Sequence, residues 1–164
     1  MERILVSSCL AGRPVRYDGA AKPVDDGLFA RWRAEGRLVP CCPEVSGGLA
    51  VPRPPAEIVG GDGRAVLDGT AAVRTAAGED VTDAFLRGAR HALDTARRAG
   101  ARVAVLKEGS PSCGSDRIYD GTFTGAATPG EGVTTALLER AGVRVFGEDD
   151  LAAVQALLTD LESR

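Results

Sequence analysis

The sequence is short of histidine and of long apolar runs and has no surplus of positive charge, and each shortage excludes a class of protein. His91 is the only histidine, so the imidazole-rich metal sites typical of catalytic zinc lack their usual ligands. No apolar run approaches the roughly 20 residues that a membrane-spanning helix requires. Lysine and arginine number 20 against 23 acidic residues, whereas a nucleic-acid-binding surface needs a basic surplus. We therefore expect neither a membrane nor a nucleic acid among its partners.

Length and cysteine content indicate a small globular protein. A chain of 164 residues that is 44% hydrophobic can bury one core, and without any repeat or linker we expect a single domain over residues 1–164. Residues 1–3 lead directly into an apolar segment, so we expect no signal peptide and a cytoplasmic location. In that compartment four cysteines are more often metal ligands or catalytic groups than a disulfide framework.

Short apolar runs alternate with amphipathic segments along the chain. The runs predict strands at residues 3–8, 37–41, 102–107 and 143–146. The amphipathic segments predict helices at residues 26–35, 81–99, 133–141 and 149–161. The segments 57–59 and 65–67, on either side of the glycine-rich turn 60–63, are expected to pair as a small hairpin.

This order of elements predicts an α/β protein. Strands that alternate with helices favour a three-layer, Rossmann-like fold with a mainly parallel sheet, to which the β-hairpin is an insertion. Three long loops rich in glycine and proline, at 10–25, 43–56 and 107–132, each follow a predicted strand. Open α/β sheets place their functional sites in loops at the carboxyl ends of the strands, so we look for the site there.

Three cysteines occupy equivalent places at the ends of predicted strands. Cys9, Cys42 and Cys113 each come shortly after an apolar run, and in a parallel sheet their thiols would converge at one edge. A single cysteine of this kind is usually a small buried hydrophobe. Three of them, flanked by glycine, proline and serine, favour a shared site. Soft thiolates without a nearby histidine suit iron–sulfur ligation better than catalytic zinc.

The neighbouring Cys41 and Cys42 cannot both be assigned to the site. Successive side chains of a strand point to opposite faces, so one of the two is directed away from the shared site. Pro43 keeps Cys42 extended as the chain leaves the strand. We therefore assign Cys42 to the site and Cys41 to the core.

Several longer motifs resemble those of the thiouracil desulfidase family, and the resemblance covers nearly the whole chain. They are Cys-Leu-Ala-Gly with Val-Arg-Tyr-Asp-Gly (9–19), Cys-Pro-Glu with Gly-Gly-Leu (42–49), Pro-Arg-Pro-Pro-Ala-Glu-Ile (52–58), Ser-Pro-Ser-Cys-Gly (110–114), Ile-Tyr-Asp-Gly-Thr-Phe-Thr-Gly (118–125) and Gly-Val-Thr-Thr-Ala-Leu-Leu (132–138). The family is one of small α/β proteins that carry an oxygen-sensitive [4Fe-4S] cluster.

The resemblance implies a cofactor and a reaction. Cys9, Cys42 and Cys113 would hold the [4Fe-4S] cluster, and the fourth iron would be left open to bind a sulfur atom. In air such a cluster is readily lost, and its cysteines can then hold another metal or pair as disulfides. The implied reaction is the non-redox desulfuration of a thiopyrimidine, either thiouracil or 4-thiouridine monophosphate, to the oxo-pyrimidine and hydrosulfide.

Such a reaction needs an acid/base, and Glu44, two residues after Cys42, is our candidate. The alternative is that its carboxylate caps local backbone N–H groups. Ser110 and Ser112 flank Pro111 before Cys113, and the resemblance implies that one of them is catalytic, with a slight preference for Ser110. Lys107 either stabilises negative charge in the site or pairs with Glu108 or Asp116.

Substrate-binding residues are expected in the motif loops. Gly132 and Thr134 open a predicted helix whose free N–H groups suit a phosphate, and Arg16 and Arg53 could add charged contacts. The alternatives are that this helix start binds nothing and that the arginines brace their loops through carboxylates such as Asp18 or Glu57.

Aromatic side chains could complete the pocket for the pyrimidine. Tyr17, which precedes Asp18 in the same motif, and Tyr119 and Phe123 could each offer a stacking face. Packing in the core or within a loop is an equally good interpretation of each ring.

Two other function classes remain open. One is another [4Fe-4S] lyase with an open iron, which would need a pocket dense in arginine and serine for a polycarboxylate. The other is a non-enzymatic iron–sulfur or metal-binding module. The sequence predicts neither the preferred thiopyrimidine nor the oligomeric state.

Overall fold

The computed structural model describes all residues, 1–164, and its centre is a four-stranded parallel sheet. Its strands are β1 (Ile4–Ser7), β2 (Leu38–Cys41), β5 (Val103–Leu106) and β8 (Arg144–Gly147), in the order β2-β1-β5-β8. The register sets Ile4 beside both Leu38 and Val103. The strands therefore end at a common edge, as the alternation of strands and helices predicts.

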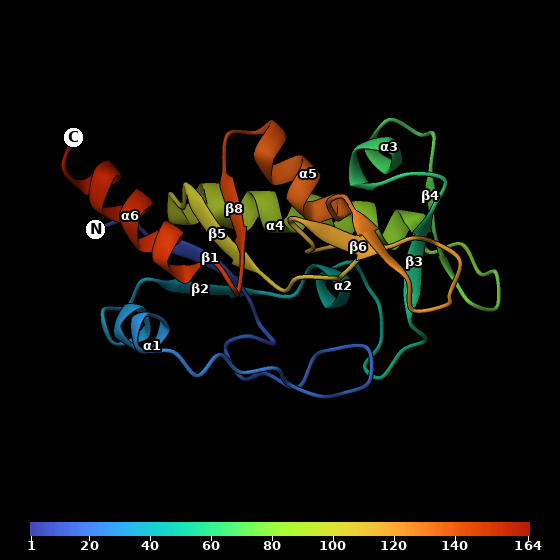
Figure 1. Cartoon of the computed structure of the whole chain (residues 1–164), viewed down its shortest axis with the longest axis horizontal. Helices are drawn as coiled ribbons and strands as arrows, with labels where there is room; N and C mark the ends of the chain where they lie inside the picture. The colour runs from blue at the N-terminus through green and yellow to red at the C-terminus, as the bar shows by residue number, and fades with distance from the viewer.

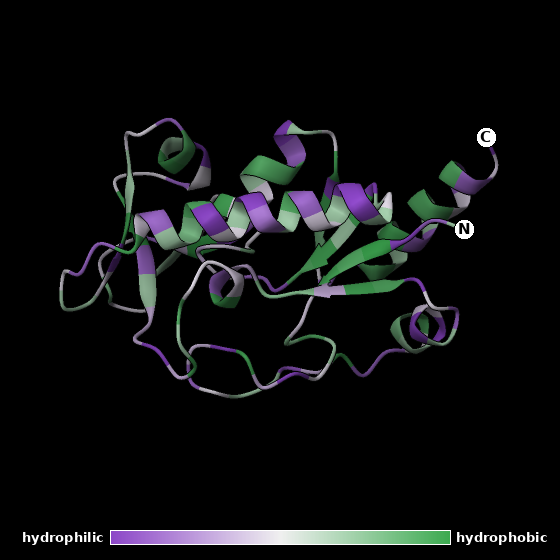
Figure 2. Ribbon diagram, turned by 180° about the vertical axis from the view of Figure 1, so that it is seen from behind, coloured by the Kyte–Doolittle hydropathy of each residue, from purple (hydrophilic) through white to green (hydrophobic).

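Helices cover both faces of this sheet, which makes three layers (Figure 1). One face carries α1 (Gly27–Ala34) and α6 (Leu151–Glu162), and the other carries α4 (Thr82–Ala99) and α5 (Val133–Arg140). Alternate residues of β1 separate the two cores: Ile4 and Val6 pack with Trp32 of α1, whereas Leu5 packs with Ala92 of α4. The two central strands, β1 and β5, are buried along their whole length and consist mainly of apolar residues, because helices cover both faces (Figure 2). The predicted fold class is confirmed.

A third core lies beside the sheet, between two small hairpins and the helices α4 and α5. The hairpins are β3 (Ala56–Val59) with β4 (Ala72–Thr75), and β6 (Arg117–Tyr119) with β7 (Ala127–Pro129). Their buried residues Ile58, Val73 and Ile118 pack against Phe85 and Val133. This second assembly extends the molecule to one side of the sheet (Figure 1).

The hairpin predicted over residues 57–67 has a different second strand. Residues 65–67 belong to a short helix, α3 (Gly63–Leu67), and β4 is the partner of β3. Asp62 explains the difference, because its carboxylate accepts hydrogen bonds from the N–H groups of Arg64 and Ala65 and so caps the helix. The predicted strand at residues 65–67 is therefore wrong.

Two of the three predicted loops also contain regular structure. The segment 43–56 begins with the one-turn helix α2 (Pro43–Ser46), and 107–132 contains the β6–β7 hairpin. Helix α2 lies directly against α4 at Gly47 and Gly88, where an added Cβ would overlap the backbone of Ala84 or Pro43. These two glycines let α2 approach α4 closely and so fix the position of the residues around Cys42.

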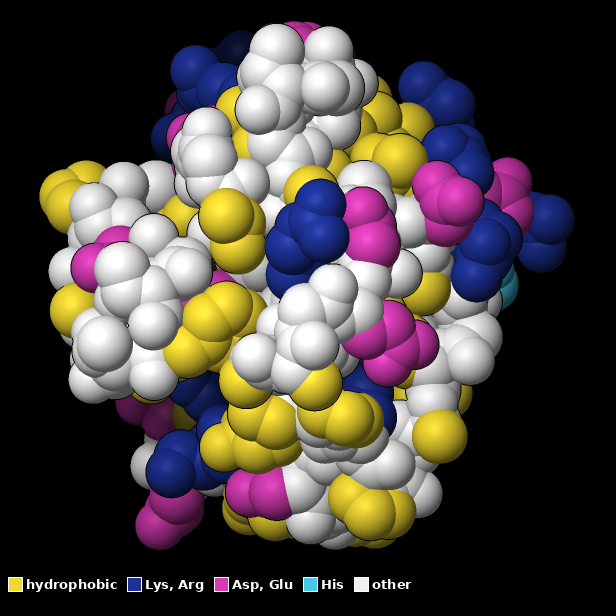
Figure 3. Space-filling model, turned by 90° about the vertical axis from the view of Figure 1, so that its right-hand side faces the viewer, with side chains coloured by type: hydrophobic (Ala, Val, Ile, Leu, Met, Phe, Trp, Pro, Cys, Tyr) yellow, Lys and Arg dark blue, Asp and Glu magenta, His cyan; other side chains and the backbone are white.

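The surface carries charges of both signs. On the face shown in Figure 3, basic and acidic side chains lie side by side among scattered hydrophobic ones. None of the helices combines the length and the apolar character needed to cross a bilayer.

Candidate active site

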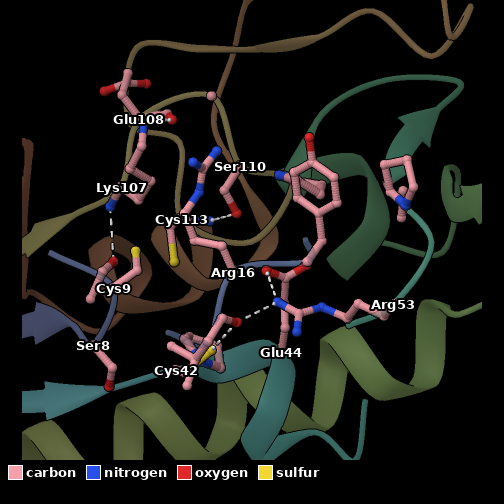
Figure 4. A pocket seen from close by; sticks show the side chains of 18 of the residues that line it. Ser8, Cys9, Arg16, Cys42, Glu44, Arg53, Lys107, Glu108, Ser110 and Cys113 are labelled. Atoms are coloured by element: carbon pink, nitrogen blue, oxygen red, sulfur yellow. Dashed lines mark hydrogen bonds and ion pairs between the residues drawn. The ribbon is translucent and has the colours of Figure 1, made fainter. Parts of the chain in front are cut away.

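A cavity of about 340 Å³ lies at the carboxyl end of the sheet, between the loops that follow β1, β2 and β5. Cys9, Cys42 and Cys113 line it, one from each loop, and their side chains border the same space (Figure 4). Cys9 and Cys113 are buried and Cys42 is partly exposed, and all three are free thiols. The structure thus brings together the three cysteines that the strand ends predict.

Cys41 and Cys42 differ in their surroundings. Cys41 is the last residue of β2, is 6% exposed and packs in the core with Ala92 and Leu138, although it also reaches the cavity wall. Cys42 has left the strand and precedes α2 at its N-cap position, with its Sγ 3.9 Å from the carbonyl oxygen of Val15. This environment agrees with the assignment of Cys42 to the site.

Burial and neighbouring thiols both affect the ionisation of Cys9 and Cys113. Burial, and then the neighbouring Cys42, raise the pKa of Cys9 to about 11. Burial also raises the pKa of Cys113 well above its usual range, and both Cys42 and Cys9 contribute to the increase. Thiolates so close together and so poorly hydrated require cations between them, and iron would supply these.

The spacing of the cysteines differs from that of a single-ion site. No three histidine, cysteine or acidic side chains are placed to hold one metal ion. In an iron–sulfur cubane each cysteine binds a different iron, so the thiols surround a larger group and need not meet at one atom. The donor set, three soft sulfurs around one cavity, fits such a cluster.

The loop that carries Cys113 is fixed by the start of α5. The N–H of Val133 donates to the carbonyl of Pro111, and those of Thr134 and Thr135 donate to Ser112. The hydroxyl of Thr135 donates to the carbonyl of Cys113 at 3.0 Å.

This arrangement contradicts the predicted phosphate contacts of Gly132 and Thr134. Neither residue lines the cavity, and the first N–H groups of α5 already donate to loop carbonyls. Gly132 is required instead for close packing, because a Cβ there would overlap the backbone of Ser112. The helix start binds the cysteine loop rather than an anion.

Glu108 fixes the other side of the same loop. Its buried carboxylate accepts three backbone hydrogen bonds at 2.9 Å, from Ser115, Asp116 and Arg117, and one from the hydroxyl of Ser115 at 2.7 Å. Burial alone would raise the pKa of Glu108, but these hydrogen bonds outweigh it and hold that pKa below its ordinary value. The sequence does not predict this role; its only local signal is the position of Glu108 in the segment that leads to Cys113.

Lys107 borders the cavity but is engaged by its neighbours. Its ammonium lies 3.0 Å from a carboxylate oxygen of Glu148 and donates to the carbonyl of Glu108 at 2.9 Å. The predicted partners were Glu108 or Asp116, so only the contact with Glu108 appears, and it is made through the backbone. Glu148, from the segment after β8, was not anticipated.

The two candidate serines are placed differently. Ser112 is completely buried, does not line the cavity and shares a 2.7 Å hydrogen bond with the hydroxyl of Thr134. Ser110 lines the cavity, and its Oγ accepts from the N–H groups of Ser112 and Cys113 at 3.0 and 3.1 Å. Because that oxygen only accepts from the protein, its hydrogen is available to a bound molecule.

Glu44 extends from α2 into the cavity (Figure 4). Its Oε2 lies 3.2 Å from Nη2 of Arg53, whose guanidinium also donates to the carbonyls of Val15 and Ala50. Burial raises the pKa of Glu44 above its ordinary value, although Arg53 opposes the effect. Arg53 thus braces its loop through Glu44 rather than through Asp18 or Glu57.

Of the three predicted substrate-binding residues 16–18, only the first two reach the cavity. Arg16 and Tyr17 line the cavity, whereas Asp18 is exposed and accepts from the N–H of Ala20 in a local turn. Asp18 is therefore not among the residues that the structure brings together, because its carboxylate stabilises the turn.

Comparison with known proteins gives the relatives of this chain. The sequence profile of the 2-thiouracil desulfurase family matches residues 4–150. The uncharacterized protein YbbK of Bacillus subtilis (strain 168) is 49% identical over 148 residues, which cover 90% of this chain and 97% of YbbK. The solved structure of a [4Fe-4S]-dependent thiouracil desulfidase, TudS, is similar with a TM-score of 0.88 and 50% identity, covering 97% of this chain and 99% of that one.

Proposed function

Because the chain belongs to the 2-thiouracil desulfurase family, we propose that it is an iron–sulfur enzyme that replaces the sulfur of a thiouracil-type pyrimidine with oxygen and releases hydrosulfide. One observation carries this proposal: three cysteines from three separate strand ends line the cavity into which Glu44 and Ser110 also project. A thiol-lined cavity with one acid/base and one free hydroxyl suits hydrolysis of a carbon–sulfur bond.

Cys9, Cys42 and Cys113 are the residues that would hold a [4Fe-4S] cluster. When bound through three cysteines, such a cluster offers an iron without a protein ligand, which acts as a Lewis acid toward the thiocarbonyl sulfur. The position of these three residues at one cavity, each after a different strand, supports this assignment, whereas Cys41 still belongs to β2.

Glu44 is the proposed general base and then the general acid. It accepts one proton from water as the water oxygen attacks the thiocarbonyl carbon, and one electron pair of the C=S double bond moves to sulfur. Glu44 returns this proton to the sulfur or to a ring nitrogen, and the remaining carbon–sulfur bond then breaks with its electron pair on the departing hydrosulfide. The second proton of the water leaves to solvent as the carbonyl group of the oxo-pyrimidine forms. No electron is gained or lost overall, so the reaction needs no external oxidant or reductant.

Ser110 is the proposed hydrogen-bond donor to the substrate. Its oxygen accepts from the N–H groups of Ser112 and Cys113, which leaves its hydroxyl hydrogen free to be donated to a bound molecule. A donor in that position can orient the pyrimidine or stabilise negative charge that develops on it. Arg16 would contribute positive charge to the same cavity.

A substrate assay after anaerobic reconstitution tests the proposal. The protein is supplied separately with 2-thiouracil, 4-thiouracil and 4-thiouridine monophosphate, and hydrosulfide release is measured together with loss of thione absorbance. Equal amounts of hydrosulfide and oxo-pyrimidine are expected. No turnover of any of the three compounds would refute the desulfidase proposal and leave the lyase or the non-enzymatic module.

The cysteine assignment has its own control. Cys9→Ala and Cys113→Ala should lose the cluster, measured as iron and acid-labile sulfide per chain, whereas Cys41→Ala should retain it. Loss in the Cys41 variant with retention in the Cys42→Ala variant would reverse the assignment of these neighbours.

A further inference from the structure

The chain has only two tyrosines, Tyr17 and Tyr119, and both line the cavity that contains the cysteines. They come from segments far apart in the sequence, the loop after β1 and the strand β6. The two residues are 41% and 44% exposed, whereas the largest buried aromatic residues, Trp32 and Phe29, are at most 1% exposed in the core. Packing in the core is therefore excluded for both tyrosines.

The backbone fixes Tyr17 at the cavity. Its carbonyl oxygen accepts a 2.7 Å hydrogen bond from the N–H of Arg53, the residue that also contacts Glu44. The guanidinium of Arg16 lies 5.8 Å from the centre of the Tyr17 ring. A partly exposed ring in a loop held in this way is a preformed surface rather than a mobile one.

Tyr119 is fixed by the strand that carries it. The preceding Ile118 is 1% exposed and points into the third core, so strand alternation directs Tyr119 to the other side, toward the cavity. The loop after β6 is tied to β3, because Glu57 accepts from the N–H groups of Gly121 and Phe123 at 2.9 and 3.2 Å.

The size of the cavity indicates which part of a substrate the two tyrosines would contact. About 340 Å³ is near the lower limit of small-molecule sites, which span roughly 300–1,000 Å³. A cluster and a pyrimidine ring would share this volume, so any substituent on the ring has to extend outward. Residues that line the cavity and are also more than two-fifths exposed stand at its mouth, where that substituent passes.

We propose that the rings of Tyr17 and Tyr119 form a recognition pair at the mouth, contacting the ring substituent of the substrate and setting the preference for a nucleoside over the free base. Aromatic side chains suit this position because they offer a broad apolar face while the hydroxyl remains hydrated. The inference rests on the proposed desulfidase function and concerns specificity only, since neither tyrosine is placed at the reacting atoms.

Steady-state kinetics of the reconstituted enzyme test the pair. Tyr17→Ala, Tyr119→Ala and the corresponding Phe variants are compared with wild type on 4-thiouridine and 4-thiouracil. Each Ala variant should raise KM for 4-thiouridine by about fivefold, change KM for 4-thiouracil less than twofold and leave kcat unchanged. The Phe variants should stay within twofold of wild type, because they keep the ring.

Two results would overturn the proposal. The first is that the Ala variants change KM equally for 4-thiouridine and 4-thiouracil, or change it for neither substrate. The second is that a Phe variant is as impaired as the Ala variant at the same position. Iron and sulfide content must match wild type in every variant. Val59→Ala serves as the matched control, because Val59 is exposed on β3 outside the cavity and should alter neither constant.

A binding experiment keeps this inference separate from the proposed activity. Uridine and uracil, which cannot release sulfur, are titrated calorimetrically into the cluster-loaded protein. Weaker uridine binding in the Ala variants with unchanged uracil binding supports the pair even if no thiopyrimidine is turned over. Turnover by wild type with unchanged uridine binding in both Ala variants refutes the pair and leaves the proposed function intact.

Discussion

Nη2 of Arg53 lies 3.2 Å from Oε2 of Glu44, and the side chain of Arg53 is only 5% exposed. The same guanidinium donates to the carbonyls of Val15, in the loop after β1, and of Ala50, in its own loop, so it connects α2 with both loops. Its Nε is buried without a partner. Arg53 therefore determines where the carboxylate of Glu44 stands, and the predictions for these two residues are coupled.

Glu44→Gln should retain the cluster and lose activity. The amide keeps the size of the side chain but cannot accept and return a proton, and general acid–base catalysis contributes roughly 10²–10⁴-fold to a rate. We expect kcat to fall at least a hundredfold at unchanged iron content, measured as hydrosulfide release per cluster. Glu79→Gln, a change at an exposed glutamate outside the cavity, is the control. Full activity in Glu44→Gln would exclude Glu44 as the acid/base.

Arg53→Lys should reduce kcat about tenfold by misplacing Glu44. A lysine keeps the charge but lacks the planar fork that bridges Glu44, Val15 and Ala50. If Arg53 acts through Glu44, the double variant with Glu44→Gln should be no worse than Glu44→Gln alone. Additive losses measured in this double-mutant cycle would show that Arg53 acts independently.

Replacing Ser110 and Ser112 by alanine should have opposite consequences. Ser110→Ala removes a hydroxyl that faces the cavity, so we expect a loss of turnover. Ser112→Ala breaks the buried hydrogen bond with Thr134 and should cost about 1 kcal/mol of the free energy of unfolding. Hydrosulfide assays and urea unfolding of both variants separate the two effects. A catalytic defect confined to Ser112→Ala would reverse the assignment.

The family, the fold class and the elements around the sheet were predictable, because apolar runs, glycine-terminated helices and the cysteine motifs are local signals. The same applies to Cys9 and Cys113, each of which follows a fully buried strand. The structure confirms the fold class and the comparisons confirm the family, while the roles of the two cysteines stay predictions that their position at the cavity supports.

The contacts that position the site were not predictable from local pattern. Gly132 and Thr134 look like an anion-binding helix start, but its N–H groups donate to the carbonyls of Pro111, Ser112 and Gly114. Those carbonyls belong to the loop that carries Cys113, and only tertiary packing brings this loop against the start of the helix. The roles of Glu108 and Glu148 were missed for the same reason, since a carboxylate that accepts backbone N–H groups leaves no periodic signature.

Glu108→Ala should release the loop that carries Cys113. The substitution leaves the N–H groups of Ser115, Asp116 and Arg117 without their acceptor, at a cost of about 3 kcal/mol. We expect lower stability and faster loss of iron on dilution into a chelator. Glu108→Gln, whose amide oxygen can still accept these three bonds, should be milder. Wild-type retention of iron in Glu108→Ala would contradict this role.

Glu139→Gln should stabilise the protein, and only above acidic pH. Partial burial of the carboxyl, then the nearby Glu131, raise the pKa of Glu139, while Arg64 and Arg144 oppose the shift. A carboxyl with a raised folded-state pKa binds its proton more tightly when folded, so its ionisation costs stability as the pH rises through that pKa. The neutral amide avoids this cost.

The gain should be a few tenths of a kcal/mol at neutral pH, because Glu139 is exposed, and should vanish near pH 3, where the carboxyl is protonated in both states. Urea unfolding of wild type and variant at both pH values measures the difference. The 2.6 Å ion pair between Arg64 and Glu131 remains in the variant, so a loss of stability cannot be attributed to that pair. An equal effect at both pH values would show that packing, not charge, governs this position.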